Sequence, residues 1–137
     1  MNISFWAAIS LINLAIKTKY ANRNSSYILF SSVAAFSSEK GMFAYSAAKS
    51  AINSAIKSIA KEISKKNQRI NTIVPGWIKT PMTDKAGQIS NLETFFDKHL
   101  LGAGNSEDVS GMVLFLLSDR AKWITGTDVV VDGGYLA

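Results

Sequence analysis

Tyr45 and Lys49 are the residues of this chain whose types and spacing point most directly to chemistry. They stand four positions apart in the segment AYSAAKSA (residues 44–51), so on a helix both side chains lie on one face. A free phenol titrates at about pH 10, and a neighbouring cation favours its ionised form. A tyrosine adjusted in this way can exchange a proton with an alcohol or carbonyl oxygen. The hydroxyl of Ser32, thirteen residues upstream of Tyr45, could hydrogen-bond the same oxygen.

Each of these residues also has an ordinary structural interpretation. Helical tyrosines often pack amphipathically, and lysines are usually solvated. A serine at the end of a strand commonly caps a turn, and Pro75-Gly76 after a strand is commonly a turn as well. The chemical interpretation therefore depends on the order and spacing of these segments together, and no single motif carries it.

Two hydrophobic periodicities alternate along the chain and predict the elements that position these side chains. Apolar residues recur at helical spacing in two long segments and in a third, where Ser106 can be the N-cap before Glu107 and Asp108. Short apolar runs between these segments predict strands. In chain order we expect a helix at 3–20, a strand at 27–31, a helix at 44–65, a strand at 69–74, a helix from 106 and a strand at 127–131.

Strands that alternate with helices of this length predict an α/β fold, in which right-handed crossovers build a parallel sheet with helices on both faces. The strands are nearly continuous apolar runs, as expected when both faces of a sheet are covered. Ligands bind beyond the carboxyl ends of such strands. One rim of the sheet should therefore hold Ser32, Pro75-Gly76, Asp132-Gly133 and the start of the helix at 44–65.

The composition restricts the remaining possibilities. The chain has 137 residues, 47% of them apolar, which suits a single domain. It contains no cysteine and one histidine, His99, so we predict no disulfide and no metal site, and a reducing, cytoplasmic setting fits. The apolar N-terminal segment is interrupted by Asn13 and is too short and too polar to span a membrane. We therefore expect neither a secretory signal nor a membrane partner.

A net charge of +5 can indicate a nucleic-acid partner. The basic residues are densest at the end of the helix at 44–65 and just beyond it, where cations favour the negative end of the helix dipole. They are Lys57, Lys61, Lys65, Lys66 and Arg69. Because no aromatic residues are interleaved for base stacking, we interpret the run as a solvated face and expect no nucleic-acid partner. A basic nucleic-acid binder is kept as a much weaker hypothesis.

Three segments together resemble the short-chain dehydrogenase/reductase family, closest to its 3-oxoacyl-carrier-protein reductases. YILFSSVAAFSSEKGMFAYSAAKSAI is similar to the family's strand, catalytic serine and Tyr-x-x-x-Lys segment. RINTIVPGWIKTPM is similar to the segment that follows the family's sixth strand, and WITGTDVVVDGG to its C-terminal signature. The resemblance implies a Rossmann-like doubly wound sheet and an oxidoreductase that transfers hydride between NAD or NADP and a small carbonyl compound or secondary alcohol.

The resemblance also implies roles for individual residues. Tyr45 would be the general acid in reduction and the base in oxidation, and Lys49 would hold the nicotinamide ribose. Ser32 would steady the substrate oxygen, and Asn2 would support a proton relay behind the lysine. The cofactor would be bound by Tyr45, Lys49, Pro75, Gly76, Ile78 and Thr80.

The large apolar residues after the second strand have two interpretations. In the family, Trp77, Met82, Phe95 and Phe96 would border the substrate, but packing in the core is the interpretation that we favour for the aromatic ones. His99 is assigned no chemistry.

The resemblance covers only the second half of the family's domain. Residues 1–137 correspond to its C-terminal part. The glycine-rich turn that cradles the pyrophosphate, and the residue that selects NAD or NADP, have no counterpart in the sequence. We therefore expect the isolated chain to bind NADH or NADPH no more tightly than millimolar.

The same half-domain has consequences for assembly. The strand at 27–31 would present an unpaired edge, which invites association. The helices at 3–20 and 44–65 match the pair through which family members commonly dimerise, so a homo-oligomer is expected. A non-catalytic oligomerisation or regulatory remnant of such an enzyme is the alternative hypothesis.

Overall fold

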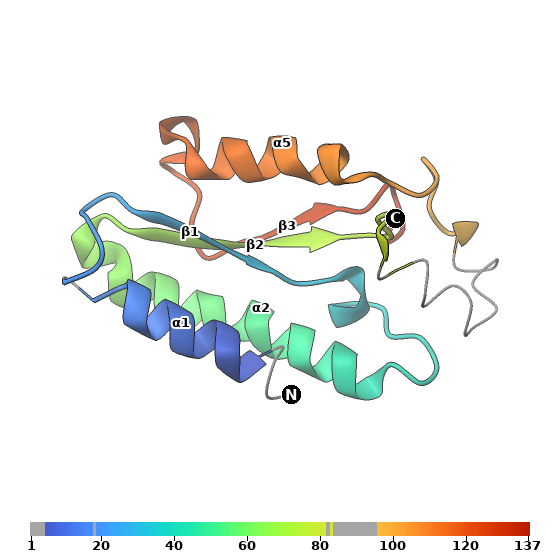
Figure 1. The fold of residues 1–137 in the computed structure, drawn as a ribbon, viewed down its shortest axis with the longest axis horizontal. Coiled ribbons are helices and arrows are strands. Elements are labelled where there is room, and N and C mark those ends of the chain that lie inside the picture. Colours follow the sequence, from blue (N-terminus) through green and yellow to red (C-terminus); the bar gives the residue numbers. More distant parts are fainter. Residues whose placement is uncertain (1–4, 18, 82, 84–95) are drawn as a thin grey trace.

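Three parallel strands and the helices that cover them make up the computed structural model, which describes residues 5–17, 19–81, 83 and 96–137. The elements are α1 (Ala7–Ala15), β1 (Ser26–Phe30), α2 (Phe43–Ile63), β2 (Arg69–Pro75), α5 (Ser106–Leu117) and β3 (Asp128–Val131). The sheet lies between two layers: α1 and α2 cover one face and α5 covers the other (Figure 1). This confirms the predicted α/β class, and each strand lies within one residue of its predicted bounds.

β2 is the central strand of the sheet. The strand order is β1-β2-β3, both pairs are parallel, and Ser26 lies opposite Arg69. Ile70, Ile73 and Val74 of β2 are fully buried, because helices cover both faces of the strand. Burial of both faces explains the continuous apolar run that predicted this strand.

Two apolar clusters fix the helices on the sheet. On the side of α1 and α2 the buried residues are Ile12, Ile52, Ile56, Ala60, Ile63 and Ile70. On the side of α5 they are Ile73, Val109, Leu116 and Ala121. Apolar residues at helical spacing predicted the helix at 44–65, and four of them, Ala48, Ile52, Ile56 and Ile63, lie on the face that α2 buries. Within the part of the chain that the structure describes, no helix is both long and apolar enough to cross a membrane.

Tertiary contacts end α1 earlier than the sequence pattern predicts. The pattern extends the helix to residue 20, whereas α1 ends at Ala15. The Tyr27 hydroxyl donates to the Ala15 carbonyl at 3.2 Å, and the Lys66 ammonium donates to the Ile16 carbonyl at 3.0 Å. These donors come from other elements and satisfy carbonyls that would otherwise accept from further helical turns.

The N-cap of α5 is Asn105, one residue before the predicted Ser106. Asn105 has an extended backbone (φ −114°, ψ 170°), and Ser106 is the first helical residue. The Asn105 N–H donates to the Asp108 carboxylate at 2.6 Å, as in a capping box. The prediction is wrong by one position because asparagine and serine cap equally well and only the backbone dihedrals distinguish them.

Two cations of the basic run bind helix ends. The Arg69 guanidinium donates to the carbonyls of Leu116 (3.0 Å), Ser118 (3.1 Å) and Ile124 (3.3 Å), at and beyond the end of α5. The Lys66 ammonium donates to the Ile16 carbonyl just beyond the end of α1. The predicted solvated face is therefore wrong for these two residues. The exposed members of the run are Lys57, Lys61 and Lys65.

β1 is an edge strand among the described residues. Its neighbour on one side is β2, because the Ser31 N–H donates to the Ile73 carbonyl at 2.8 Å and the Arg69 N–H to the Ser25 carbonyl at 2.9 Å. In a parallel pair alternate residues bond to the neighbour, so the backbone groups of Phe30 point to the open side. This is the unpaired edge that the resemblance implied.

Candidate active site

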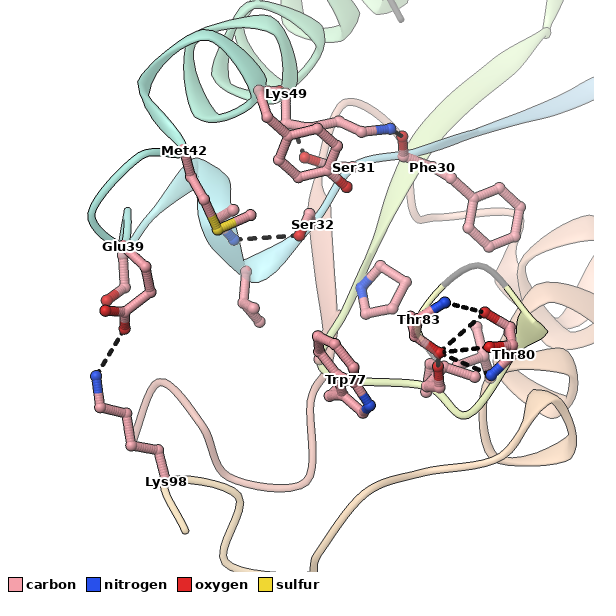
Figure 2. A pocket seen from close by; sticks show the side chains of 18 of the residues that line it. Phe30, Ser31, Ser32, Glu39, Met42, Lys49, Trp77, Thr80, Thr83 and Lys98 are labelled. Atoms are coloured by element: carbon pink, nitrogen blue, oxygen red, sulfur yellow. Dashed lines mark hydrogen bonds and ion pairs between the residues drawn. The ribbon is translucent and has the colours of Figure 1, made fainter. Parts of the chain in front are cut away.

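A cavity of about 930 Å³ opens at the carboxyl ends of β1 and β2 (Figure 2). Its walls come from the segment after β1, the beginning of α2, the loop after β2 and one side of α5. The structure brings together on this cavity the predicted site residues Ser32, Tyr45, Lys49, Pro75, Gly76, Ile78 and Thr80. The rim predicted from the strand ends is therefore present, and the roles of these residues stay predictions.

Lys49 is held by the backbone at the end of β1. Its ammonium donates to the Phe30 carbonyl, on the open edge of the strand, at 2.8 Å (Figure 2). The nitrogen also lies 5.7 Å from the centre of the Tyr45 ring, within the range of a cation–π contact. Burial lowers the pKa of the Lys49 ammonium from its ordinary value. Because an ammonium has three donors, the bond to Phe30 uses one of the three.

Tyr45 and Ser32 line the cavity from different elements. Tyr45 stands in the first turn of α2 and is 40% exposed. Ser32 is the N-cap of the short helical turn after β1, and its oxygen accepts the Ala34 N–H at 3.2 Å (Figure 2). That contact uses an acceptor lone pair of the hydroxyl and leaves its O–H to donate. The structural and the chemical interpretation of Ser32 are therefore compatible.

Serines tie the beginning of α2 to the segment after β1. The Ser46 hydroxyl donates to Ser38 at 2.8 Å, and the Ser50 hydroxyl donates to the Ala35 carbonyl at 2.9 Å. The small side chains of this part of the helix allow the close approach that these bonds need. They fix the Tyr-x-x-x-Lys turn relative to Ser32, which accounts for its alanine- and serine-rich composition.

The loop after β2 passes too close to its neighbours for a side chain at position 76. A Cβ added to Gly76 would lie 2.7 Å from the Asp132 carbonyl oxygen and 2.8 Å from His99 Nε2. The Gly76 N–H donates to the Val131 carbonyl at 3.1 Å. Asp132 and Gly133, which were predicted for the same rim, line a smaller cavity of about 280 Å³ that shares Gly76, Trp77 and Ile78 with the large one.

Thr80 is bonded within its own turn. Its N–H donates to Thr83 Oγ1 at 2.8 Å, and the two hydroxyl oxygens lie 3.1 Å apart (Figure 2). The Thr83 N–H donates in return to Thr80 Oγ1 at 3.2 Å. The hydroxyl of Thr80, a residue predicted to bind the cofactor, is thus part of a network that holds the turn at the cavity wall.

A polar cluster that the sequence did not predict includes two residues of the cavity wall, Glu39 and Lys98. The Glu39 carboxylate accepts from the Lys98 ammonium at 2.6 Å and from the Tyr135 hydroxyl at 2.8 Å. The hydrogen bond from Lys98, which has the larger effect, and the one from Tyr135 hold the pKa of Glu39 below its ordinary value. Burial and the bond to Glu39 raise the pKa of the Tyr135 phenol. The partners of Glu39 stand 59 and 96 positions away, so no local pattern signals the cluster.

The other residues named from the sequence fall into two groups. Asn2, Met82 and Phe95 lie outside the described residues. Phe96 packs edge-on against Trp77, with ring centres 5.0 Å apart, and Trp77 also lines the large cavity. Trp77 therefore contributes both to packing and to the cavity wall.

Comparison with known proteins identifies the family. A family model described as enoyl-(acyl carrier protein) reductase matches residues 1–136. The chain is 32% identical over 135 residues to the 3-oxoacyl-[acyl-carrier-protein] reductase of Thermotoga maritima, covering 98% of this chain and 54% of that protein. The chain spans about half the length of the curated relatives it matches.

Two solved structures with this fold were determined with a nicotinamide cofactor. A 4-hydroxyisoleucine dehydrogenase complexed with NADH has a TM-score of 0.88 and 28% identity, covering 98% of this chain and 56% of that chain. A blue fluorescent protein from a metagenomic library, in complex with NADPH, has a TM-score of 0.86 and 26% identity, covering 100% and 55%. With a family match over nearly every residue and these relatives, the chain belongs to the short-chain dehydrogenase/reductase family of oxidoreductases.

Proposed function

We propose that this chain carries the catalytic residues of a nicotinamide-dependent oxidoreductase that interconverts a carbonyl compound and a secondary alcohol. The observation that carries the proposal is the convergence of Ser32, Tyr45 and Lys49 on one cavity with the loop after β2. Family membership supports the reaction class. The complexes of similar proteins with NADH and NADPH support the cofactor class.

Each of the three polar side chains has a distinct task in this proposal. The Tyr45 hydroxyl donates a proton to the carbonyl oxygen during reduction and takes it back during oxidation. The Ser32 O–H hydrogen-bonds the same oxygen and sets its position. The Lys49 cation lies 5.7 Å from the centre of the Tyr45 ring and stabilises the negative charge that the phenol acquires when it gives up its proton.

The donors and walls of the cavity suit the nicotinamide half of NAD or NADP. When bound, the cofactor supplies or accepts the hydride. Lys49 has two N–H donors besides the one bonded to Phe30, and ribose hydroxyls can accept from them. Apolar residues such as Ile78 and Val109 line the cavity and suit a flat ring. The proposal covers NAD and NADP alike.

The proposed substrate is a small carbonyl compound or alcohol. Relatives of this chain include 3-oxoacyl-[acyl-carrier-protein] reductases, so a 3-oxoacyl thioester is the first substrate to test. We also propose that residues 1–137 form the C-terminal part of a single Rossmann-type domain in a cytoplasmic protein. About half the length of the relatives has no counterpart here, and we propose that another polypeptide segment seats the adenosine half of the cofactor.

The proposed partner is a second copy of the chain, bound through α1 and α2. Large apolar side chains stay exposed on or beside these helices. They are Trp6 (56%), Leu11 (67%), Leu14 (48%) and Phe43 (81%). Exposed apolar side chains of this number on neighbouring helices are typical of an interface.

The half-length match also favours a second candidate, a non-catalytic oligomerisation or regulatory remnant of such an enzyme. A chain that matches 54–56% of its relatives can keep Tyr45 and Lys49 by descent and still lack a complete cofactor site. The two candidates differ in whether Tyr45 transfers a proton.

The substitution Tyr45→Phe tests the proposal. With millimolar NADH or NADPH and a 3-oxoacyl thioester, we expect the wild type to consume reduced cofactor and Tyr45→Phe to lower kcat by about 10²- to 10⁴-fold, the range for a lost general acid. Tyr20→Phe is the matched control, because Tyr20 is 60% exposed and is not among the residues that line the cavity. Equal turnover by wild type and Tyr45→Phe would contradict the proposal, and no turnover by either would favour the remnant.

A further inference from the structure

His99, the one histidine of the chain, is buried against the loop that follows β2. Its Nε2 accepts a hydrogen bond from the Trp77 backbone N–H at 2.9 Å. A backbone N–H can only donate, so Nε2 carries no proton. A neutral His99 therefore carries its proton on Nδ1, and the geometry selects one of the two tautomers.

The position of His99 is fixed by a ring contact on the face of its imidazole and by a hydrogen bond to its backbone carbonyl. Its ring lies against the ring of Tyr135, with centres 4.8 Å apart and planes inclined by 36°. Tyr135 in turn donates its hydroxyl to Glu39 at 2.8 Å. The His99 carbonyl accepts from the Gly102 N–H at 2.8 Å. These contacts fix the direction in which Nε2 points.

Nε2 points at the part of the loop that forms the cavity wall. Pro75, Gly76 and Trp77 all line the large cavity. The Gly76 N–H still belongs to the sheet, because it bonds to the β3 carbonyl of Val131, so the Trp77 N–H is the next donor along the loop. The Trp77 peptide is hydrogen-bonded on both sides. Its N–H donates to His99 Nε2 at 2.9 Å, and its carbonyl accepts from the Gly104 N–H at 2.9 Å.

We propose that His99 is a positioning residue for the candidate active site. It holds the loop after β2 by accepting a hydrogen bond from the Trp77 N–H, and it can do so only while its imidazole is neutral. The inference rests on the proposed function in one respect, that this loop is a wall of the ligand site. A second proton on the imidazole makes Nε2 a donor facing another donor, so the bond to Trp77 is lost. The loop then keeps the hydrogen bond from the Gly104 N–H to the Trp77 carbonyl.

Among the described residues, several charged or titratable side chains near the imidazole have hydrogen-bond partners of their own. Lys98 and Tyr135 both donate to Glu39. The Asp132 carboxylate accepts from two backbone N–H groups of the C-terminal turn at 2.9 Å each. Asp108, which lines the small cavity together with His99, accepts from a backbone N–H at 2.6 Å. Protonation of His99 removes the bond between Nε2 and Trp77, because both groups are then donors.

Nitrogen NMR of the imidazole tests the tautomer directly. Because the chain has one histidine, its ring signals need no assignment. At pH 7.5 we expect an unprotonated Nε2 that shows scalar coupling to the Trp77 amide. A proton on Nε2 at that pH would overturn the proposal.

Two substitutions separate positioning from packing. His99→Gln keeps an acceptor at the place of Nε2 and does not titrate, whereas His99→Leu keeps apolar volume and has no acceptor. We expect hydrogen exchange of the Trp77 amide to be at least about tenfold faster in His99→Leu and within about threefold of wild type in His99→Gln. The amides of Ile73 and Val74 in β2 report on the fold and should not change. Faster exchange throughout β2, or no change at Trp77, would overturn the proposal.

A pH comparison keeps the test decisive even where His99→Leu does not fold. Over the pH range in which the nitrogen signals of the imidazole show its second protonation, and after correction for intrinsic exchange, the Trp77 amide of the wild type should lose at least about tenfold protection and that of His99→Gln should not. Equal behaviour of the two would overturn the proposal. No cofactor takes part in these measurements. They therefore test the role of His99 even if the proposed oxidoreductase function proves wrong.

Discussion

Backbone groups fix several side chains at or beside the cavity. Lys49 donates to the Phe30 carbonyl, Ser32 accepts from the Ala34 N–H, and His99 accepts from the Trp77 N–H. The sheet and the helices set the positions of these backbone groups. The fold therefore sets the positions of these three side chains, which is the condition for a preorganised site.

The first prediction at the residue scale concerns Gly76. Gly76→Ala would put a Cβ 2.7 Å from the Asp132 carbonyl oxygen, a backbone atom that no side-chain rotation can move away. We expect the free energy of unfolding, measured by urea denaturation, to fall by about 1–3 kcal/mol.

Gly111→Ala is the matched control for that prediction. Gly111 lies within α5, and an added Cβ meets nothing within 4 Å. Alanine favours the helix over glycine, so we expect a gain of about 0.5–1 kcal/mol in the free energy of unfolding. Effects of the same sign in the two variants would contradict the packing argument.

The second prediction concerns Glu39 and acid pH. Bonds from Lys98 and Tyr135 lower the pKa of Glu39 in the folded chain, so the folded state favours the carboxylate. This stabilisation is fully present above the ordinary pKa of a glutamate and is lost as the pH falls through the lower folded pKa. The difference in free energy of unfolding between wild type and Glu39→Gln should thus be largest near pH 7 and shrink toward pH 3.

The size of that difference should be small, and its pH dependence is the part to measure. The Glu39 side chain is 37% exposed, so solvent screens its interaction with Lys98. Tyr135→Phe removes one of the two donors to the carboxylate and should show a weaker pH dependence than the wild type. A difference between wild type and Glu39→Gln that stays constant from pH 7 to pH 3 would refute the assignment.

At the scale of elements, the C-terminal ends of α1 and α5 are capped by residues from other elements. Arg69, at the start of β2, binds three carbonyls at and beyond the end of α5, and Lys66 binds a carbonyl at the end of α1. A cation at a helix C-terminus both donates to free carbonyls and meets the negative end of the dipole. These contacts connect the start of β2 to helices on both faces of the sheet.

The third prediction tests this connection. Arg69→Met should lower the free energy of unfolding by about 1.5–3 kcal/mol, because three carbonyls lose a charged donor. Lys65→Met removes the same charge from an exposed position of the same basic run and should change it by less than about 0.5 kcal/mol. Thermal or urea unfolding measures both. A similar loss in the two variants would mean that net charge, and not helix capping, is responsible.

At the scale of the whole molecule, the fourth prediction concerns self-association through α1 and α2. Leu11→Glu should weaken a dimer built on these helices, because Leu11 is 67% exposed on α1 and a carboxylate would be buried at the interface. Leu114→Glu, on α5 across the sheet, changes a leucine that is 69% exposed and serves as the matched control. Sedimentation over a range of concentrations distinguishes the variants. Equal dissociation by both substitutions would argue against the α1 and α2 interface.

Much of the fold follows from local patterns in the sequence. Apolar runs located the three strands to within one residue, and the apolar face at 44–65 predicted the side of α2 that is buried. Strand and helix periodicity are properties of neighbouring residues, so a single sequence reveals them. The turn that carries Tyr45 and Lys49 is also local, because four positions on a helix determine that both side chains share a face.

Contacts between distant segments could be decided only by the tertiary structure. The bonds of Lys49 to Phe30, of Glu39 to Tyr135 and of His99 to Trp77 join residues that stand 19, 96 and 22 positions apart. No periodicity relates such partners, because parallel strands with helical crossovers bring them to the same end of the sheet. The sequence by itself therefore determined the elements and the candidate Tyr-x-x-x-Lys chemistry. The packed structure decided which backbone groups hold those side chains, where the helices end, and that His99 faces the loop after β2.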